Sequence, residues 1–159
     1  LGPVPVIAQL EGWCLGGGLE VALACDLRLG STASTYGMPE VKVGIPSVIH
    51  AALLPRRVGM SAAAWLLLTG ENIDAAEAQR LDLLNELHAP EALASAVQAR
   101  AAQLAALGPQ VLRQQKRMLR AWERMTVEDA VAASVAEFGA AFTTGEPQAH
   151  MRAFIERKR

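Results

Sequence analysis

The sequence predicts an α/β fold in its first half and a helical region in its second half. Up to about residue 89, short apolar runs alternate with turns and brief helical stretches, as expected for strands and helices packed in layers. From residue 90 onward, long alanine- and leucine-rich stretches are separated only by short breaks at Gly and Pro. We therefore expect a partial α/β core over residues 1–89 and a helical region over residues 90–159.

The first predicted elements surround three consecutive glycines at residues 16–18. Residues 4–10 are expected to form a strand and residues 19–25 a short buried helix. Glycines at such a junction allow a tight turn and leave amide N–H groups facing outward at the helix N-terminus, which favours negative charge. Glu20 falls in the first turn of that helix. Amide donors beside a carboxylate can polarise a carbonyl group and move a proton.

The rest of the first half is expected to contain short elements separated by turns. The predictions are strands over residues 26–29 and 35–37, a loop over 41–47, a helix over 48–54 ending near Pro55, a helix over 62–68 with Ser61 as N-cap, a helix over 75–81 capped by Asp74, and a strand over 83–87.

The second half is expected to consist of four helices over about residues 90–107, 109–125, 126–142 and 147–158. The second of these carries basic side chains on one side, which we expect to form a solvated face. These side chains are Arg113, Lys116, Arg117 and Arg120.

Composition limits the classes of function. With 159 residues, 52% of them hydrophobic and 19% charged, the chain can bury a sizeable core. A net charge of −1 argues against general binding to nucleic acid or membrane surfaces, and no apolar run is long enough to span a bilayer. Cys14 and Cys25 lack the spacing of a metal site, so we expect no metal and a reducing, cytoplasmic environment. Because the chain starts without Met, we expect it to be the later part of a longer polypeptide.

An ordered set of motifs runs through the chain. They are Val6-Ile7-Ala8, Gly16-Gly17-Gly18-x-Glu20, Ala24-Cys25-Asp26, Tyr36-Gly37-Met38-Pro39-Glu40, Gly44, Arg57-Val58-Gly59 and Leu68-Thr69-Gly70. In this order and spacing, the chain resembles the C-terminal portion of the enoyl-CoA hydratase/isomerase (crotonase) superfamily. The resemblance covers essentially the whole chain. It implies a spiral of ββα units with a C-terminal helical oligomerisation region, and a homotrimer or a hexamer.

The resemblance also implies roles for particular residues. Gly17 would supply one backbone N–H of an oxyanion hole for a thioester carbonyl, and Glu20 and Glu40 would hold the attacking water and shuttle a proton. The substrate would further meet Trp13, Gly16, Pro39, Ile45 and His50. Phe154 and Lys158 would reach the coenzyme A site of a neighbouring subunit, or simply belong to a packed terminal helix. The second oxyanion N–H comes from a loop that precedes this portion of the family's chain, so we expect the 159 residues alone to be inactive.

The implied function is addition of water to a 2-enoyl-CoA thioester in fatty acid metabolism, with coenzyme A as part of the substrate and no permanently bound cofactor. Two carboxylates favour a hydratase over an isomerase, because hydration needs both a base for water and an acid for the α-carbon. The alternatives are another crotonase reaction (isomerisation, thioester hydrolysis, decarboxylation or dehalogenation) or a non-catalytic oligomerising member.

Several residues also have a plainer interpretation. Glu20 can complement the helix dipole, Glu40 can be a solvated loop residue, and His50 can be a structural histidine rather than a pocket residue. The basic face of residues 109–125 can instead attract the phosphates of coenzyme A. Residues 45–55 replace a glycine-rich stretch of many family members with bulkier side chains, and Asp82 stands where a glycine is common.

Overall fold

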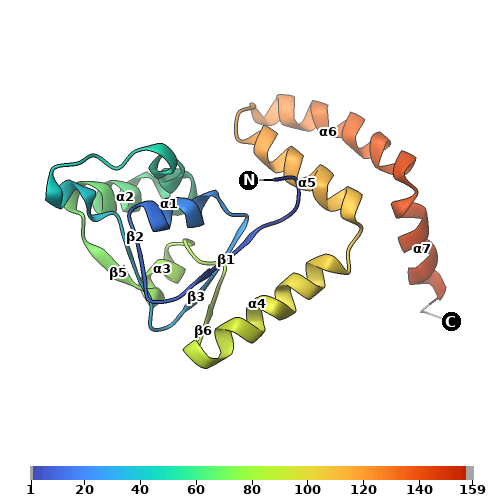
Figure 1. The fold of residues 1–159 in the computed structure, drawn as a ribbon. Coiled ribbons are helices and arrows are strands. Elements are labelled where there is room, and N and C mark those ends of the chain that lie inside the picture. The colour runs from blue at the N-terminus through green and yellow to red at the C-terminus, as the bar shows by residue number, and fades with distance from the viewer. Residues whose placement is uncertain (1, 157–159) are drawn as a thin grey trace. The chain divides into compact units, whose positions relative to one another are not determined.

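The computed structural model describes residues 2–156 (Figure 1). Its contacts divide the chain into two compact units. The first runs from Val6 to Ala102, and the second combines Gly2–Pro5 with the chain from Gln103 onward. The two units therefore meet between Ala102 and Gln103, inside the helix that begins at Pro90. The domain boundary expected at residue 89 stays a prediction.

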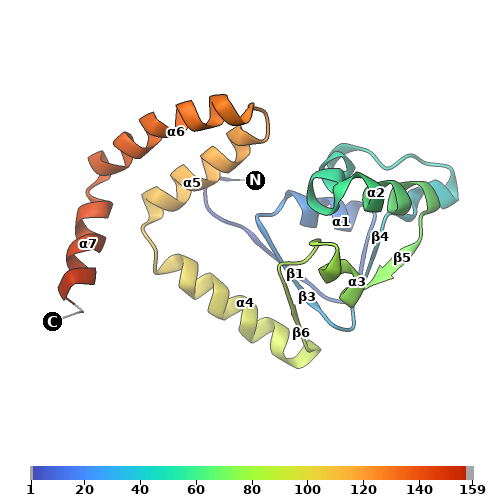
Figure 2. The same cartoon turned by 180° about the vertical axis from the view of Figure 1, so that it is seen from behind.

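Two small sheets form the framework of the first unit (Figures 1 and 2). In one sheet, β1 (Ile7–Leu10), β3 (Leu27–Ser31) and β6 (Glu86–His88) lie parallel, in the order β1-β3-β6. In the other sheet, β4 (Thr35–Gly37) pairs with β2 (Trp13–Leu15) in parallel and with β5 (Asn72–Asp74) in antiparallel fashion.

The order of these elements matches the expected ββα spiral. The chain runs β1, β2, α1 (Gly17–Ala24) and then β3 and β4, and each strand of the second pair lies beside its counterpart in the first. The mixed α/β class is confirmed. Strands β2 and β5 are missing from the sequence prediction, because three residues give too short a pattern and only their pairing defines them.

The core of the first unit draws on both sheets and on α1, α2 and α3. Its largest fully buried side chains are Leu19, Leu23, Leu29, Tyr36, Met38, Leu54 and Leu66. The apolar side of α1 is therefore anchored, which fixes its N-terminal end at the surface where Gly17 and Gly18 are exposed.

Between β4 and β5 the chain is helical for most of its length. It forms 3-10 turns over Pro39–Val43 and Ile49–Leu53 and then α2 (Leu54–Thr69), which bends at Gly59 and ends at the left-handed Gly70. Three expectations are wrong here. Residues 41–47 are only partly a loop, Pro55 opens a helix rather than ending one, and Ser61 is no N-cap. Proline fits a first helical turn because its missing N–H has no partner there.

The next turns follow the sequence closely. Helix α3 (Ala75–Arg80) begins at Asp74, whose Oδ1 accepts a hydrogen bond of 2.8 Å from the Glu77 amide. Asp82 has φ 60°, the left-handed conformation that Asp tolerates better than most residues.

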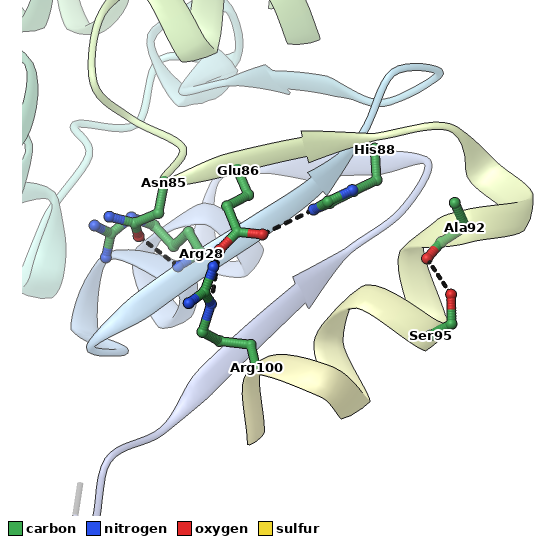
Figure 3. A network of polar contacts seen from close by, with 7 residues as sticks. All are labelled: Arg28, Asn85, Glu86, His88, Ala92, Ser95 and Arg100. Atoms are coloured by element: carbon green, nitrogen blue, oxygen red, sulfur yellow. Dashed lines mark hydrogen bonds and ion pairs between the residues drawn. The ribbon is translucent and has the colours of Figure 1, made fainter. Parts of the chain in front are cut away.

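A polar network joins β6 to the start of the helical half (Figure 3). The Glu86 carboxylate accepts a 2.8 Å hydrogen bond from Arg100 Nε and lies 2.9 Å from His88 Nε2. These contacts, with that of His88 first, lower the pKa of Glu86. On the neighbouring strand, the Arg28 amide donates to Asn85 Oδ1 at 2.8 Å. His88 is thus part of a half-buried network rather than a free surface residue.

The helical half contains α4 (Pro90–Ala105), α5 (Pro109–Trp122), α6 (Val127–Ala141), a 3-10 turn at Phe142–Thr144, and α7 (Glu146–Glu156). These bounds agree with the prediction to within a few residues. The Thr126 hydroxyl accepts from the Asp129 amide at 3.1 Å and caps α6.

The predicted solvated basic face of α5 is partly wrong. Lys116 is buried and donates from Nζ to the Val4 carbonyl at 2.6 Å, whereas Arg117 is exposed as predicted and pairs with Glu137 at 2.7 Å. Both partners are distant in sequence, so the helical pattern alone does not reveal them.

Candidate active site

The tight turn at Gly16 carries the predicted site. Gly16 has φ 51° and ψ −125°, a conformation that favours glycine. Its amide donates to the Gly37 carbonyl at 2.9 Å, which ties the turn to β4, and its carbonyl accepts from the Glu20 amide at 2.9 Å. Gly17 and Gly18 follow as the exposed first residues of α1. Amides in a first helical turn have no intrahelical acceptor and face outward.

Glu20 stands in the first turn of α1 and is only 8% exposed. Its Oε2 accepts a hydrogen bond of 2.8 Å from the backbone amide of His50. A buried carboxylate needs such a partner, because burying charge without a hydrogen bond is costly. One oxygen of Glu20 is therefore held by the main chain of a segment 30 residues away.

Glu40 reaches the same turn from the 3-10 helix over Pro39–Val43. Its Oε2 accepts a 2.8 Å hydrogen bond from the Ser47 hydroxyl. Its other oxygen lies directly against Gly16: a Cβ placed there would collide with Oε1 and come within 3.2 Å of Cδ. The glycine at position 16 thus gives the carboxylate its space. Gly16, Gly17, Glu20 and Glu40 together are called the glycine-turn site below.

The segment that holds both carboxylates has an unusual backbone. Ile49 adopts φ 51°, which is rare for a β-branched residue, and its side chain is 78% exposed. The following residue, His50, presents its amide to Glu20. The predicted roles of His50 concern its imidazole, whereas the contact with Glu20 is made by its main chain. A role for the side chain in a pocket stays a prediction.

Ser47 is the functional candidate that the sequence motifs do not single out, because its contact with Glu40 depends on the path of the loop between them. The available signal was a hydroxyl seven residues after Glu40, across a loop punctuated by Gly44 and Pro46.

The other predicted site residues are distributed as follows. Trp13 is 75% exposed at the start of β2, which leads into Gly16, and Pro39 opens the 3-10 turn that carries Glu40. Ile45 is 56% exposed in the loop that precedes Ser47. Phe154 is 59% exposed on α7, in the second unit. Lys158 lies outside the described residues.

Cys14, two residues before the turn, is not a suitable nucleophile. It is 6% exposed, and burial raises the pKa of its thiol to about 11, which keeps it protonated near neutral pH. Within residues 2–156 no group of three or more His, Cys, Asp or Glu side chains has the geometry of a metal site. No helix in that range is long and apolar enough to cross a membrane.

The arrangement has a definite chemical capacity. Outward amides at Gly17 and Gly18 can stabilise developing negative charge on a carbonyl oxygen. Each of the two carboxylates has Oε2 engaged by a hydrogen bond, from His50 or from Ser47. Two such carboxylates beside one anion-stabilising turn suit proton transfer at carbons activated by that carbonyl.

Comparison with known proteins gives a consistent set of similarities. The family model described as Enoyl-CoA hydratase/isomerase matches residues 1–159. The chain is 35% identical over 156 residues to the short-chain-enoyl-CoA hydratase of Clostridium acetobutylicum, covering 98% of this chain and 60% of that protein. It is 36% identical over 155 residues to the (E)-benzylidenesuccinyl-CoA hydratase of Thauera aromatica, covering 97% and 60%.

A crystal structure of enoyl-CoA hydratase subunit I from Geobacillus kaustophilus superposes with a TM-score of 0.93 at 31% identity. It is matched over 98% of this chain and 61% of its own length. The chain thus spans about 60% of the length of the curated relatives that it matches.

Proposed function

The chain belongs to the enoyl-CoA hydratase/isomerase family, and from that premise we propose that the whole protein adds water to a 2-enoyl-CoA thioester. The observation that carries the proposal is the placement of two glutamates around the turn at Gly16: Glu20 lies in the first turn of the helix that follows it, and Glu40 Oε1 lies against Gly16. Coenzyme A enters as part of the substrate, and the proposal needs no permanently bound cofactor.

In the proposed reaction, the Gly17 amide donates a hydrogen bond to the thioester carbonyl oxygen. As negative charge moves onto that oxygen, the β-carbon of the conjugated double bond becomes electrophilic. One such donor typically contributes a factor on the order of 10²–10³ to the rate. The second donor of the oxyanion hole would come from outside the 60% of the relatives' length that this chain matches.

The two carboxylates divide the proton transfers. Water loses a proton to a carboxylate as its oxygen bonds to the β-carbon, and the α-carbon of the resulting enolate gains a proton. Glu20 and Glu40 are the bases and acids for these steps, and each contributes a factor on the order of 10²–10⁴. The net change is addition of one water, with no electron transfer.

We extend the proposal to the surroundings of the site and to the assembly. Trp13, Pro39, Ile45 and His50 would border the acyl group, and Phe154 would contact the coenzyme A bound to a neighbouring subunit. A trimer or hexamer would form through the helical half. It is supported by an exposed apolar row on α6, made of Val127, Val131, Val135 and Phe138. Two buried cysteines that are not joined in a disulfide favour a reducing compartment such as the cytoplasm.

The test is an assay of the whole protein on 2-enoyl-CoA thioesters of increasing chain length, following loss of the conjugated thioester absorbance. We expect a product that has gained the mass of one water. A product of unchanged mass indicates an isomerase, release of free coenzyme A thiol indicates a thioester hydrolase, and loss of carbon dioxide from a carboxylated substrate indicates a decarboxylase. No reaction with any member of the panel refutes the proposal.

A further inference from the structure

We propose that Ser47 is a positioning residue: its hydroxyl fixes the Glu40 carboxylate with Oε1 against the Gly16 turn, so that Oε1 is the oxygen available for proton transfer. This inference deepens the hydration proposed above and rests on it. The starting observation is the 2.8 Å hydrogen bond from Ser47 Oγ to Glu40 Oε2.

Main-chain hydrogen bonds fix only the backbone of Glu40, whereas the Ser47 hydroxyl fixes its carboxylate. The backbone of Glu40 is held by its 3-10 turn and by the amide of Ile45, which follows that turn and donates to the Glu40 carbonyl at 3.1 Å. The side chain still has three rotatable bonds, and a glutamate loses rotamer entropy when it is ordered. Within residues 2–156, Ser47 is the only side chain recorded as a hydrogen-bond donor to Glu40.

The two carboxylates differ in what holds them. Glu20 Oε2 is bound by a backbone amide, which any residue at position 50 except proline supplies. Glu40 Oε2 is bound by a side chain, so its orientation depends on the amino acid at position 47. An ionised carboxylate only accepts hydrogen bonds, which makes the serine hydroxyl the donor.

In residues 45–49 the apolar side chains are exposed and the polar Ser47 side chain is partly buried, which is the reverse of the usual pattern. Ser47 is half-buried, whereas the apolar side chains of Ile45, Val48 and Ile49 are 56%, 53% and 78% exposed. A short segment ordinarily turns its apolar side chains inward. Here the hydroxyl turns inward, toward Glu40. The two oxygens of the Glu40 carboxylate are rigidly linked. When Ser47 holds Oε2, Oε1 is therefore fixed as well, in its place against Gly16.

The first arm of the test is steady-state kinetics of the whole protein with Ser47→Ala and Ser47→Thr. We expect Ser47→Ala to lower kcat by about 10- to 100-fold, the value of one hydrogen bond to a charged group, with little change in KM. Ser47→Thr keeps the hydroxyl and should restore most of kcat. Ser95→Ala is the matched control, since it removes a hydroxyl that donates only to the Ala92 carbonyl within α4 (Figure 3).

The second arm does not depend on activity. Infrared difference spectra of protein with ¹³C-labelled glutamate, taken against Glu40→Gln, isolate the carboxylate stretching band of Glu40. We expect this band to shift in Ser47→Ala, to return in Ser47→Thr, and to stay in place in Ser95→Ala.

The outcomes separate the two proposals. An unmoved band in Ser47→Ala, or a wild-type kcat in that variant, overturns the role of Ser47. A rise in KM alone also overturns it, because that result indicates substrate binding rather than positioning of a proton-transfer group. If the wild-type protein shows no hydration of any enoyl-CoA, the proposed function fails, and the infrared band alone then decides whether Ser47 holds Glu40.

Discussion

Replacement of Gly16 by alanine should damage both stability and activity. The residue has φ 51° and ψ −125°, and holding a non-glycine residue in such a conformation costs about 1–3 kcal/mol. Alanine recovers about 0.4–1 kcal/mol by restricting the unfolded chain. We therefore expect Gly16→Ala to lower the free energy of unfolding by about 1–2 kcal/mol. This value excludes the collision between the new Cβ and Glu40.

That collision predicts a larger effect on catalysis than on stability. The new Cβ would overlap Glu40 Oε1, so the carboxylate must move away from the turn. If Glu40 transfers a proton, its displacement lowers kcat by a factor on the order of 10²–10⁴. The assays are urea denaturation of the whole protein and hydration of a short 2-enoyl-CoA.

Gly18 provides the control for stability. A Cβ at Gly18 meets nothing within 4 Å and its φ is not positive, so Gly18→Ala should leave stability unchanged or raise it by up to about 1 kcal/mol. Equal stability of the Gly16→Ala and Gly18→Ala variants would refute the conformational argument. A Gly16→Ala protein with wild-type kcat would refute the placement of Glu40.

Three further predictions concern the rest of the fold. Ile49→Gly should raise the free energy of unfolding, measured by urea denaturation, by about 1 kcal/mol. The reason is that relief of the left-handed backbone strain at Ile49 exceeds the entropy that glycine adds to the unfolded chain. A lower free energy of unfolding in this variant would contradict the prediction. The pKa of the Cys14 thiol is 9.0 in the unfolded chain and about 11 in the folded one. Unfolding therefore releases a proton at pH values between these two pKa values. About 2–3 kcal/mol of stability, present below pH 9, should be lost as the pH rises to 11, and Cys14→Ala should abolish this loss. Glu146 accepts 2.9 Å hydrogen bonds from the Gln110 and Val111 amides, and these bonds lower the pKa of its carboxyl. Because its folded-state pKa is lowered, Glu146 stabilises the fold at neutral pH, and this stabilisation is lost as the pH falls through that pKa. Glu146→Gln should therefore lower the melting temperature at pH 7 and reduce the fall in melting temperature on acidification. A melting temperature identical to that of the wild type at pH 7 would contradict this.

The glycine turn at residues 16–18 and Glu20 could be found from the sequence because each depends on local chemistry at a fixed position, whereas Glu40 was indicated only by the family resemblance. Glycine permits the turn, and a carboxylate is favoured in a first helical turn. The structure brings these residues together at one sheet, since the paired strands β2 and β4 lead into the turn and into Pro39.

The contacts that hold the carboxylates could not be predicted in this way. The amide of His50 reaches Glu20 from 30 residues away, through a conformation of Ile49 that its side chain disfavours. The Ser47 hydroxyl depends on the path of the loop after Gly44. Propensity describes average preferences, whereas these contacts depend on tertiary structure that overrides them.

The same limit applies to the helical half. Arg117 is exposed, as its helix alone indicates, but its pairing with Glu137 on α6 at 2.7 Å is not visible in that pattern. Lys116 is covered because the chain near Val4 packs on α5. Pairing between segments distant in sequence leaves no periodic signal in either segment.

The most direct test of the glycine-turn site is the hydration rate of the whole protein in Glu20→Gln, Glu40→Gln and the double variant, measured on one 2-enoyl-CoA. The two carboxylates are proposed to act as a unit on one water and one enolate. Each single change should therefore lower kcat by a factor on the order of 10²–10⁴, and the double change should cost little more than the worse single change. A wild-type rate in either single variant would contradict the two-carboxylate site.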